Sequence, residues 1–195
     1  MKTATPEIAR VLTALAEGLS LAGAAHTFGY SERTLSTWLC RVGTHAERVH
    51  GRLFRNLQLL QVQLDELRTT LRDKGTALWV WLAFDVKTKT IVAVKMGPRT
   101  QDLAQSLVHA VVGNLAPGWI PLFTSDGLDL YGYALTSHFG AWVERADRAK
   151  RQWEVAKGLL YGQVLKRYRR RRIVRVERRI RRGSGGRLYG ETESP

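Results

Sequence analysis

From residue 57 onward the apolar residues follow a strand-like spacing, whereas those before it follow a helical one. In LLQVQLDEL (59–67), apolar side chains alternate with polar ones that end in Asp65. The next run, ALWVWLAFDV (77–86), opens with an unbroken apolar series, as a strand covered on both faces would. The residues TKT then turn the chain into IVAVKM (91–96), which predicts an antiparallel hairpin. Three meandering strands are therefore expected.

Helical spacing returns over 101–114, where Thr100 can serve as the N-cap. A fourth strand-like run, 119–125, leads to Asp126, and a second helix is expected over 128–139. This order matches the start of the ribonuclease H-like fold, in which a right-handed crossover lays the fourth strand parallel to the first. We expect an α+β (α/β-like) chain with an incomplete mixed sheet in the order β-β-β-α-β-α-β behind an all-helical N-terminus.

Parallel pairing of the first and fourth strands would make Asp65 and Asp126 neighbours. Two carboxylates so close repel each other unless a proton or a divalent cation lies between them. Oxygen ligands select Mg²⁺ or Mn²⁺, which can activate a nucleophile and stabilise the leaving oxygen of a phosphodiester. The simpler alternative is that Asp126 caps the following helix through its first free N–H groups. Among the other acids, Glu66 is expected to point to the opposite sheet face in a structural role, and Asp85 and Asp129 to serve a hairpin turn and a first helical turn.

The first fifty residues have the spacing of a helical DNA-binding unit. A helix is predicted over 6–17, and a short second helix is expected to end at Gly29, after which Ser31 caps a third. Leu35, Trp38 and Leu39 are expected to be buried. This spacing resembles the helix-turn-helix, although a plain helical hairpin uses the same signals. The predicted DNA-facing residues of the last helix are Arg33, Ser36 and Thr37.

Charge points to a polyanionic partner. The chain has 31 Lys and Arg against 17 Asp and Glu, a formal net charge of +14. The segment KRYRRRRIVRVERRIRR (166–182) holds most of this excess, so it predicts phosphate binding, whereas the alternative is a solvated basic tail. Two strand-like runs flank an arginine turn, which indicates a β-hairpin laid along DNA. Its tip consists of Arg169, Arg170, Arg171 and Arg172. Binding of structured RNA by the same arm is a third alternative.

Four motifs together resemble bacterial insertion-sequence transposases of the DDE type. They are VQLDELRT (62–69), GPRT (97–100), TSDGLDLY (124–131) and LLYGQVLKRYRRRR (159–172). The resemblance covers about residues 45–182. It implies a ribonuclease H-like domain behind a DNA-binding N-terminus, with Asp65 and Asp126 as the first two metal-binding acids. It also implies metal-dependent cleavage and strand transfer of double-stranded DNA at element ends, a Mg²⁺ or Mn²⁺ cofactor, and a homo-oligomer.

The family's third acid is a glutamate on a helix that follows the fifth strand, and no segment of this chain matches it. The glutamates that remain lie in a strand-like segment, in a connector over 140–158 that the pattern does not assign, or in the C-terminal tail. They are Glu177, Glu144, Glu154, Glu191 and Glu193. We therefore expect a truncated or frame-disrupted copy with impaired catalysis, or a non-catalytic helix-turn-helix regulator.

The predicted domains are a helix-turn-helix unit (1–50), a transposase core (51–182) and a disordered tail (183–195). The longest apolar run is far shorter than the roughly 20 residues that span a bilayer, and the N-terminus lacks a signal pattern. A cytoplasmic, nucleoid-associated bacterial protein without a membrane segment is expected. The single cysteine, Cys40, excludes a disulfide within the chain and a zinc site built on paired cysteines.

Overall fold

The computed structural model describes residues 3–70, 77–144 and 150–183. The chain divides into two compact units, Met1–Phe54 and Arg55–Pro195. The tail predicted over 183–195 lies, apart from Gly183, outside the described residues.

The first unit consists of three helices, α1 (Thr5–Ala16), α2 (Leu21–Phe28) and α3 (Glu32–Leu53). As predicted, α2 ends at Gly29, which has a left-handed φ of 72°, and the Ser31 side chain accepts a hydrogen bond from the N–H of Thr34 at the start of α3. The core of this unit is made of Val11, Ala24, Leu35 and Trp38.

The prediction that Leu39 is buried is wrong. Its side chain is 43% exposed, whereas Leu35 is completely buried and Trp38 nearly so. The partners of α3 are the short helices α1 and α2, of 12 and 8 residues. They close a core over the first turns of α3, and Leu39 lies beyond it.

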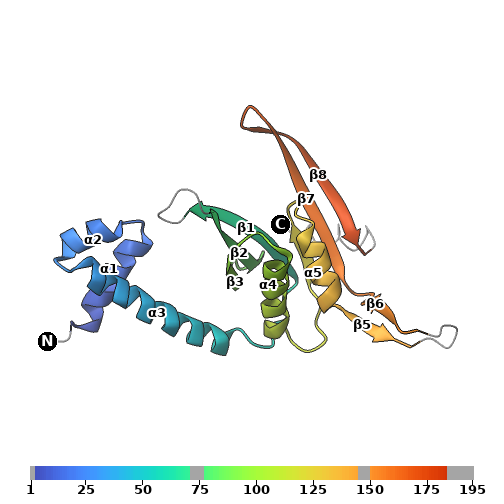
Figure 1. The fold of residues 1–195 in the computed structure, drawn as a ribbon, viewed down its shortest axis with the longest axis horizontal. Coiled ribbons are helices and arrows are strands. Elements are labelled where there is room, and N and C mark those ends of the chain that lie inside the picture. The colour runs from blue at the N-terminus through green and yellow to red at the C-terminus, as the bar shows by residue number, and fades with distance from the viewer. Residues whose placement is uncertain (1–2, 71–76, 145–149, 184–195) are drawn as a thin grey trace. The chain divides into compact units, whose positions relative to one another are not determined.

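The second unit is built on a six-stranded mixed sheet in the order β3-β2-β1-β4-β7-β8. The first three strands are antiparallel neighbours, β4 is parallel to both β1 and β7, and β8 is antiparallel to β7 (Figure 1). The strands are β1 (Gln61–Thr70), β2 (Ala77–Asp85), β3 (Ile91–Gly97), β4 (Leu122–Ser125), β7 (Leu160–Arg169) and β8 (Arg172–Arg182). Together with five described helices, this mixed sheet is compatible with a ribonuclease H-like fold.

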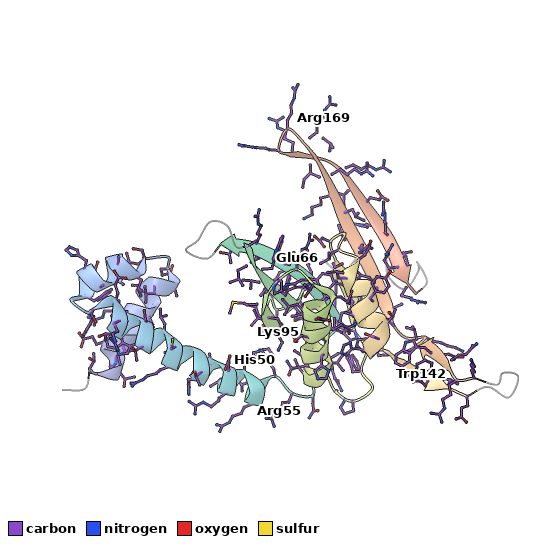
Figure 2. The ribbon with its side chains drawn as sticks, viewed as in Figure 1. His50, Arg55, Glu66, Lys95, Trp142 and Arg169 are labelled. Carbon is purple, nitrogen blue, oxygen red and sulfur yellow. The ribbon has the colours of Figure 1, made fainter. Side chains whose placement is uncertain are left out.

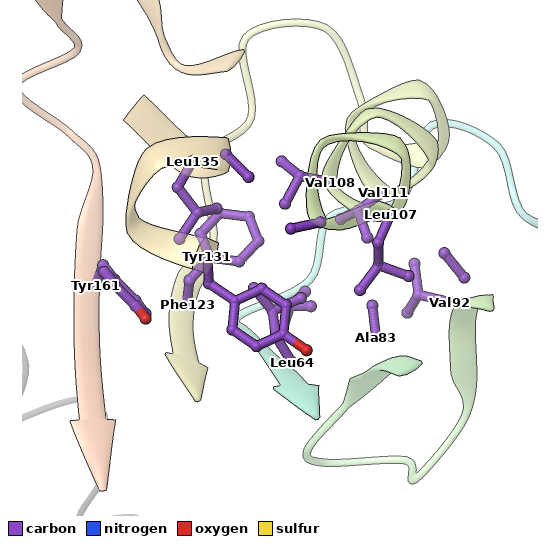
Figure 3. Close-up of a cluster of buried hydrophobic side chains, with 14 of the residues drawn as sticks. Leu64, Ala83, Val92, Leu107, Val108, Val111, Phe123, Tyr131, Leu135 and Tyr161 are labelled. Carbon is purple, nitrogen blue, oxygen red and sulfur yellow. The ribbon is translucent and has the colours of Figure 1, made fainter. Parts of the chain in front are cut away.

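Two helices pack on one face of this sheet, α4 (Gln101–Asn114) and α5 (Leu130–His138). The first has the predicted bounds. Figure 3 shows the apolar side chains of both helices facing those of the strands. Buried members of this core include Leu64, Ala83, Leu107, Val108, Val111, Phe123, Tyr131 and Leu135.

Among the described residues of the second unit the opposite face is only partly covered, so the prediction that 77–86 is covered on both faces is wrong for one of them. Trp81 and Ala83 are completely buried beneath the helices. On the other face Val94 and Met96, the strand partners of Leu82 and Val80, are 51% and 67% exposed. An unbroken apolar run therefore did not distinguish a strand buried on one face from one buried on both.

Two further differences concern segment boundaries. The fourth strand begins at Leu122, three residues later than predicted, because Gly118 has a left-handed φ of 75° and Pro121 has no N–H to donate. The connector 140–158 contains a separate two-stranded hairpin, β5 (Gly140–Val143) and β6 (Gln152–Val155).

None of the described helices is long and apolar enough to cross a membrane.

Candidate metal centre and nucleic-acid interface

The sheet register brings Asp65 and Asp126 together. Leu64 of β1 pairs with Ser125 of β4 in parallel register, so each aspartate directly follows a residue of the same pair. One carboxylate oxygen each from Asp65, Asp126 and Glu66 lie within 4.8 Å of one another. Local parallel pairing thus juxtaposes two acids that are 61 positions apart in the sequence.

Asp126 shapes the turn between β4 and α5. Its Oδ1 accepts a hydrogen bond of 3.0 Å from the N–H of Leu128. The helix predicted over 128–139 begins at Leu130, with Asp129 at the N-cap. Asp126 therefore closes an Asx-type turn before the helix and is not the helix cap itself. Asp129 makes no side-chain cap and instead accepts a 2.7 Å hydrogen bond from Arg181.

A buried chain of hydrogen bonds stabilises the turn that carries Asp126. Gln163 donates to the Tyr161 hydroxyl at 3.1 Å, and the hydroxyls of Tyr161 and Ser125 lie 2.8 Å apart. Ser125 in turn donates to the backbone carbonyl of Asp126 at 2.8 Å, so the shared proton between the hydroxyls comes from Tyr161. Gln163 also donates to the carbonyl of Leu128 at 3.3 Å. Burial raises the pKa of Tyr161, which keeps its hydroxyl a donor.

Glu66 belongs to a second network, on the helix-covered side of β1. Its carboxylate accepts a hydrogen bond of 3.0 Å from the Tyr131 hydroxyl and pairs with the Arg99 guanidinium at 2.5 Å. The Glu66 side chain is only 2% exposed. Arg99 also lies over the Trp79 ring, 4.9 Å from its centroid. Burial and the Glu66 carboxylate both raise the pKa of Tyr131 well above its usual range.

A polar cavity opens beside the two aspartates. It has a volume of about 460 Å³ and is lined by both acids together with Gln63, Thr124 and Lys166. Its donor set fits a hard divalent cation, because the carboxylates of Asp65 and Asp126 supply oxygen ligands and the cavity has room for water to complete the coordination. Lys166 adds a positive charge that suits a phosphate in the same space.

The described glutamates outside this cluster do not join it. Glu177 lies in β8, where the neighbouring Arg179 donates to it at 2.7 Å and lowers its pKa. Glu144 pairs with Arg151, and Glu154 lies in β6. Glu191 and Glu193 fall outside the described residues.

The basic segment forms a long hairpin of β7 and β8 (Figure 1). Figure 2 shows Arg169 at its far end. The turn residues Arg170 and Arg171 have left-handed φ angles of 48° and 64°, the combination that a two-residue hairpin turn requires. All four predicted tip residues, Arg169 to Arg172, are exposed.

The predicted DNA-facing residues of the first unit lie on α3. Arg33 and Thr37 are exposed and Ser36 is partly exposed, so the three lie away from the buried Leu35 and Trp38. The Thr37 hydroxyl donates to the carbonyl of Arg33 at 2.9 Å, which leaves its oxygen able to accept.

The sequence predicted that the two aspartates would be neighbours, as they are, but not the two hydrogen-bond networks around them. Ser125 and Tyr131 lie inside the quoted TSDGLDLY motif, and Gln163 lies inside LLYGQVLKRYRRRR. A polar residue at a core-facing position of a strand, as Gln163 is, was the available signal.

Comparison with known proteins includes the following similarities. A family described as IS1 transposase matches residues 58–180. The insertion element iso-IS1n protein InsB of Shigella dysenteriae is 33% identical over 70 residues, which is 36% of this chain and 50% of the relative. The chain thus spans about half the length of this curated relative. The crystal structure of the Mos1 Strand Transfer Complex matches 71% of this chain and 57% of its own, at 11% identity and a TM-score of 0.31.

Proposed function

Since the chain belongs to the IS1 transposase family, we propose that it binds double-stranded DNA at the ends of an insertion element and that Asp65 and Asp126 hold the divalent cation for DNA cleavage and strand transfer. The observation that carries this proposal is the juxtaposition of the two carboxylates at the point where β4 ends beside the middle of β1. Mg²⁺ and Mn²⁺ are the expected cations.

The protein's own residues would divide the work as follows. Asp65 projects from β1 into the cavity, while the turn held by Ser125 and Gln163 presents Asp126 to it. A bound cation would neutralise the repulsion of the two acids and stabilise developing charge on phosphate oxygens. Lys166, on the cavity wall, would orient a DNA phosphate.

DNA binding is assigned to two surfaces. We propose that residues 1–50 form a helix-turn-helix in which Arg33, Ser36 and Thr37 face the major groove; the left-handed Gly29 and the serine cap support this assignment. The arginines at 169–172 would contact phosphates without reading bases. The core over 51–182 would carry the chemistry, and self-association of the chain is expected from the family resemblance.

The test is nicking of a duplex that carries the element ends, with Mg²⁺ or Mn²⁺. We expect slow, cation-dependent nicking, because both oxygens of Glu66, the third carboxylate of the described cluster, are already bonded to Tyr131 and Arg99. Asp65→Asn and Asp126→Asn should each abolish it, whereas Asp102→Asn, an exposed acid in the first turn of α4, should not. Nicking that survives both site substitutions would contradict the proposal. Specific DNA binding without any cation-dependent product would favour a non-catalytic regulator.

A further inference from the structure

We propose that Glu66 is a positioning residue that braces Asp65 against the segment carrying Asp126, through its hydrogen bond to Tyr131. This inference rests on the proposed function of the aspartate pair. Glu66 follows Asp65 in the sequence, but its side chain points to the helix-covered face of the sheet.

The first half of the brace is the link from Glu66 to Asp65. The two residues are consecutive in β1, so their side chains project to opposite faces of the sheet. The N–H of Glu66 donates to Asp65 Oδ1 at 2.8 Å, which fixes the rotation of that carboxylate. A side-chain contact that holds Glu66 in place therefore also holds the backbone N–H that orients the first acid of the pair.

The second half is the link from Glu66 to the segment after Asp126. Tyr131 lies in the first turn of α5, five positions beyond Asp126. Its ring is completely buried and packs edge-on against Trp81, with centroids 5.6 Å apart. Figure 3 shows this ring beneath α5 in the core, and its hydroxyl donates to Glu66 at 3.0 Å. One side chain thus connects β1 to the helix that the second acid introduces.

Arg99 offsets the electrostatic cost of burying the Glu66 carboxylate beside the two aspartates. A nearly buried carboxylate without a partner would be costly, and beside two more acids it would add to their repulsion. The Arg99 guanidinium neutralises Glu66 at 2.5 Å and is itself held over the Trp79 ring. One carboxylate oxygen of Glu66 is therefore bonded to Arg99 and the other to Tyr131. With both oxygens engaged by protein donors, Glu66 has the contacts expected of a brace.

The experiment measures Mn²⁺ affinity of the full chain by electron paramagnetic resonance of the free ion. Substitution of groups that orient metal ligands typically weakens affinity about 10- to 100-fold. We expect Tyr131→Phe, which removes only the brace oxygen, to raise the Kd for Mn²⁺ about 10-fold within that range. Tyr133→Phe is the matched control, because Tyr133 lies on the same helix and is 68% exposed; it should leave the Kd unchanged. Circular dichroism establishes that each variant is folded.

Glu66→Gln separates a brace from a ligand. Glutamine can still accept the Tyr131 hydrogen bond through its amide oxygen, so if Glu66 acts as a brace, Glu66→Gln should weaken Mn²⁺ binding less than Tyr131→Phe does, and the double substitution should cost little more than Tyr131→Phe alone. Weakening by Glu66→Gln with no effect of Tyr131→Phe would overturn the inference and make Glu66 a ligand. Mn²⁺ binding by the unaltered chain that Asp65→Asn does not reduce would instead overturn the proposed function, and the brace with it.

Discussion

Tyr161 is the central residue of the buried hydrogen-bond chain beneath Asp126. Its hydroxyl receives a hydrogen bond from Gln163 and donates one to Ser125, and the side chains of both partners are almost fully buried. Removing one partner of a buried bond leaves the other unsatisfied, at a cost of about 1–3 kcal/mol. A single oxygen atom of Tyr161 therefore stabilises the turn that presents the second acid.

We predict that Tyr161→Phe lowers the free energy of unfolding by about 1–3 kcal/mol. The change removes only the hydroxyl, and the ring stays in the core. The effect is measured by chemical denaturation of the full chain, monitored by a spectroscopic signal that reports the unfolding of the second unit. Tyr133→Phe, at an exposed site of α5, should change stability by less than about 0.5 kcal/mol. Equal effects of the two substitutions would mean that the buried chain contributes nothing specific.

The proximity of the two aspartates was predictable from the sequence, whereas the contacts that support them were not. Asp65 and Asp126 each end an apolar or alternating run, so a topological expectation was enough to pair them. Glu66 was expected to have a structural role on the opposite face, and its partners Arg99 and Tyr131 lie 33 and 65 positions away. Such contacts depend on side-chain directions that no local pattern records.

The β7–β8 hairpin combines a tight turn with a concentration of positive charge. Arg170 and Arg171 adopt left-handed φ angles that Asn and Gly adopt with much less strain. Arginine at both positions therefore lowers the stability of the turn but places two exposed cations at the tip. Exposed cations at the tip are the feature expected of a hairpin that contacts phosphates.

We predict that replacing Arg170 by Asn and Arg171 by Gly leaves the hairpin intact but weakens DNA binding at low salt. Each lost phosphate contact should reduce the slope of log K against log salt by about 0.9, so the pair should reduce it by about 1.8. Fluorescence anisotropy over a series of salt concentrations measures this slope. The matched control replaces Lys87 by Asn and Lys89 by Gly in the β2–β3 turn, where Lys89 also has a positive φ of 59°. An equal loss of slope in the control would show that only net charge matters.

The elements themselves were largely predictable where periodicity was long. The helix over 101–114 and the three meandering strands follow from apolar spacing of that kind. The structure of segment 140–158 could not be predicted, because β5 and β6 are each four residues long and therefore too short to show a hydrophobic period. Tertiary contacts hold this hairpin, among them the packing of Trp142 against Trp153 and the hydrogen bond from Trp153 to the carbonyl of Thr136. The exposure of one face of the sheet could not be predicted from the sequence of β2, because a strand with an unbroken apolar run can be buried on one face or on both.

The two units have separate hydrophobic cores. The core of the first is closed by Val11, Ala24, Leu35 and Trp38, whereas that of the second lies between the sheet and α4 and α5. Specific DNA recognition and cation binding are proposed for different units. A change in one core should therefore affect one activity and spare the other.

We predict that Leu35→Ala abolishes specific binding to element ends and leaves Mn²⁺ affinity unchanged. Leu35 is completely buried in the first unit, so truncation should cost about 2–5 kcal/mol, a large share of the stability of so small a core. Leu39→Ala is the matched control on the same helix, because the 43% exposed Leu39 lies outside this core and its loss should leave both activities intact. Competition between specific and random duplexes measures recognition, and the free-ion signal measures Mn²⁺ binding. Loss of Mn²⁺ affinity in Leu35→Ala would mean that the two units fold as one cooperative body, whereas retained specific binding would place DNA recognition outside the first unit.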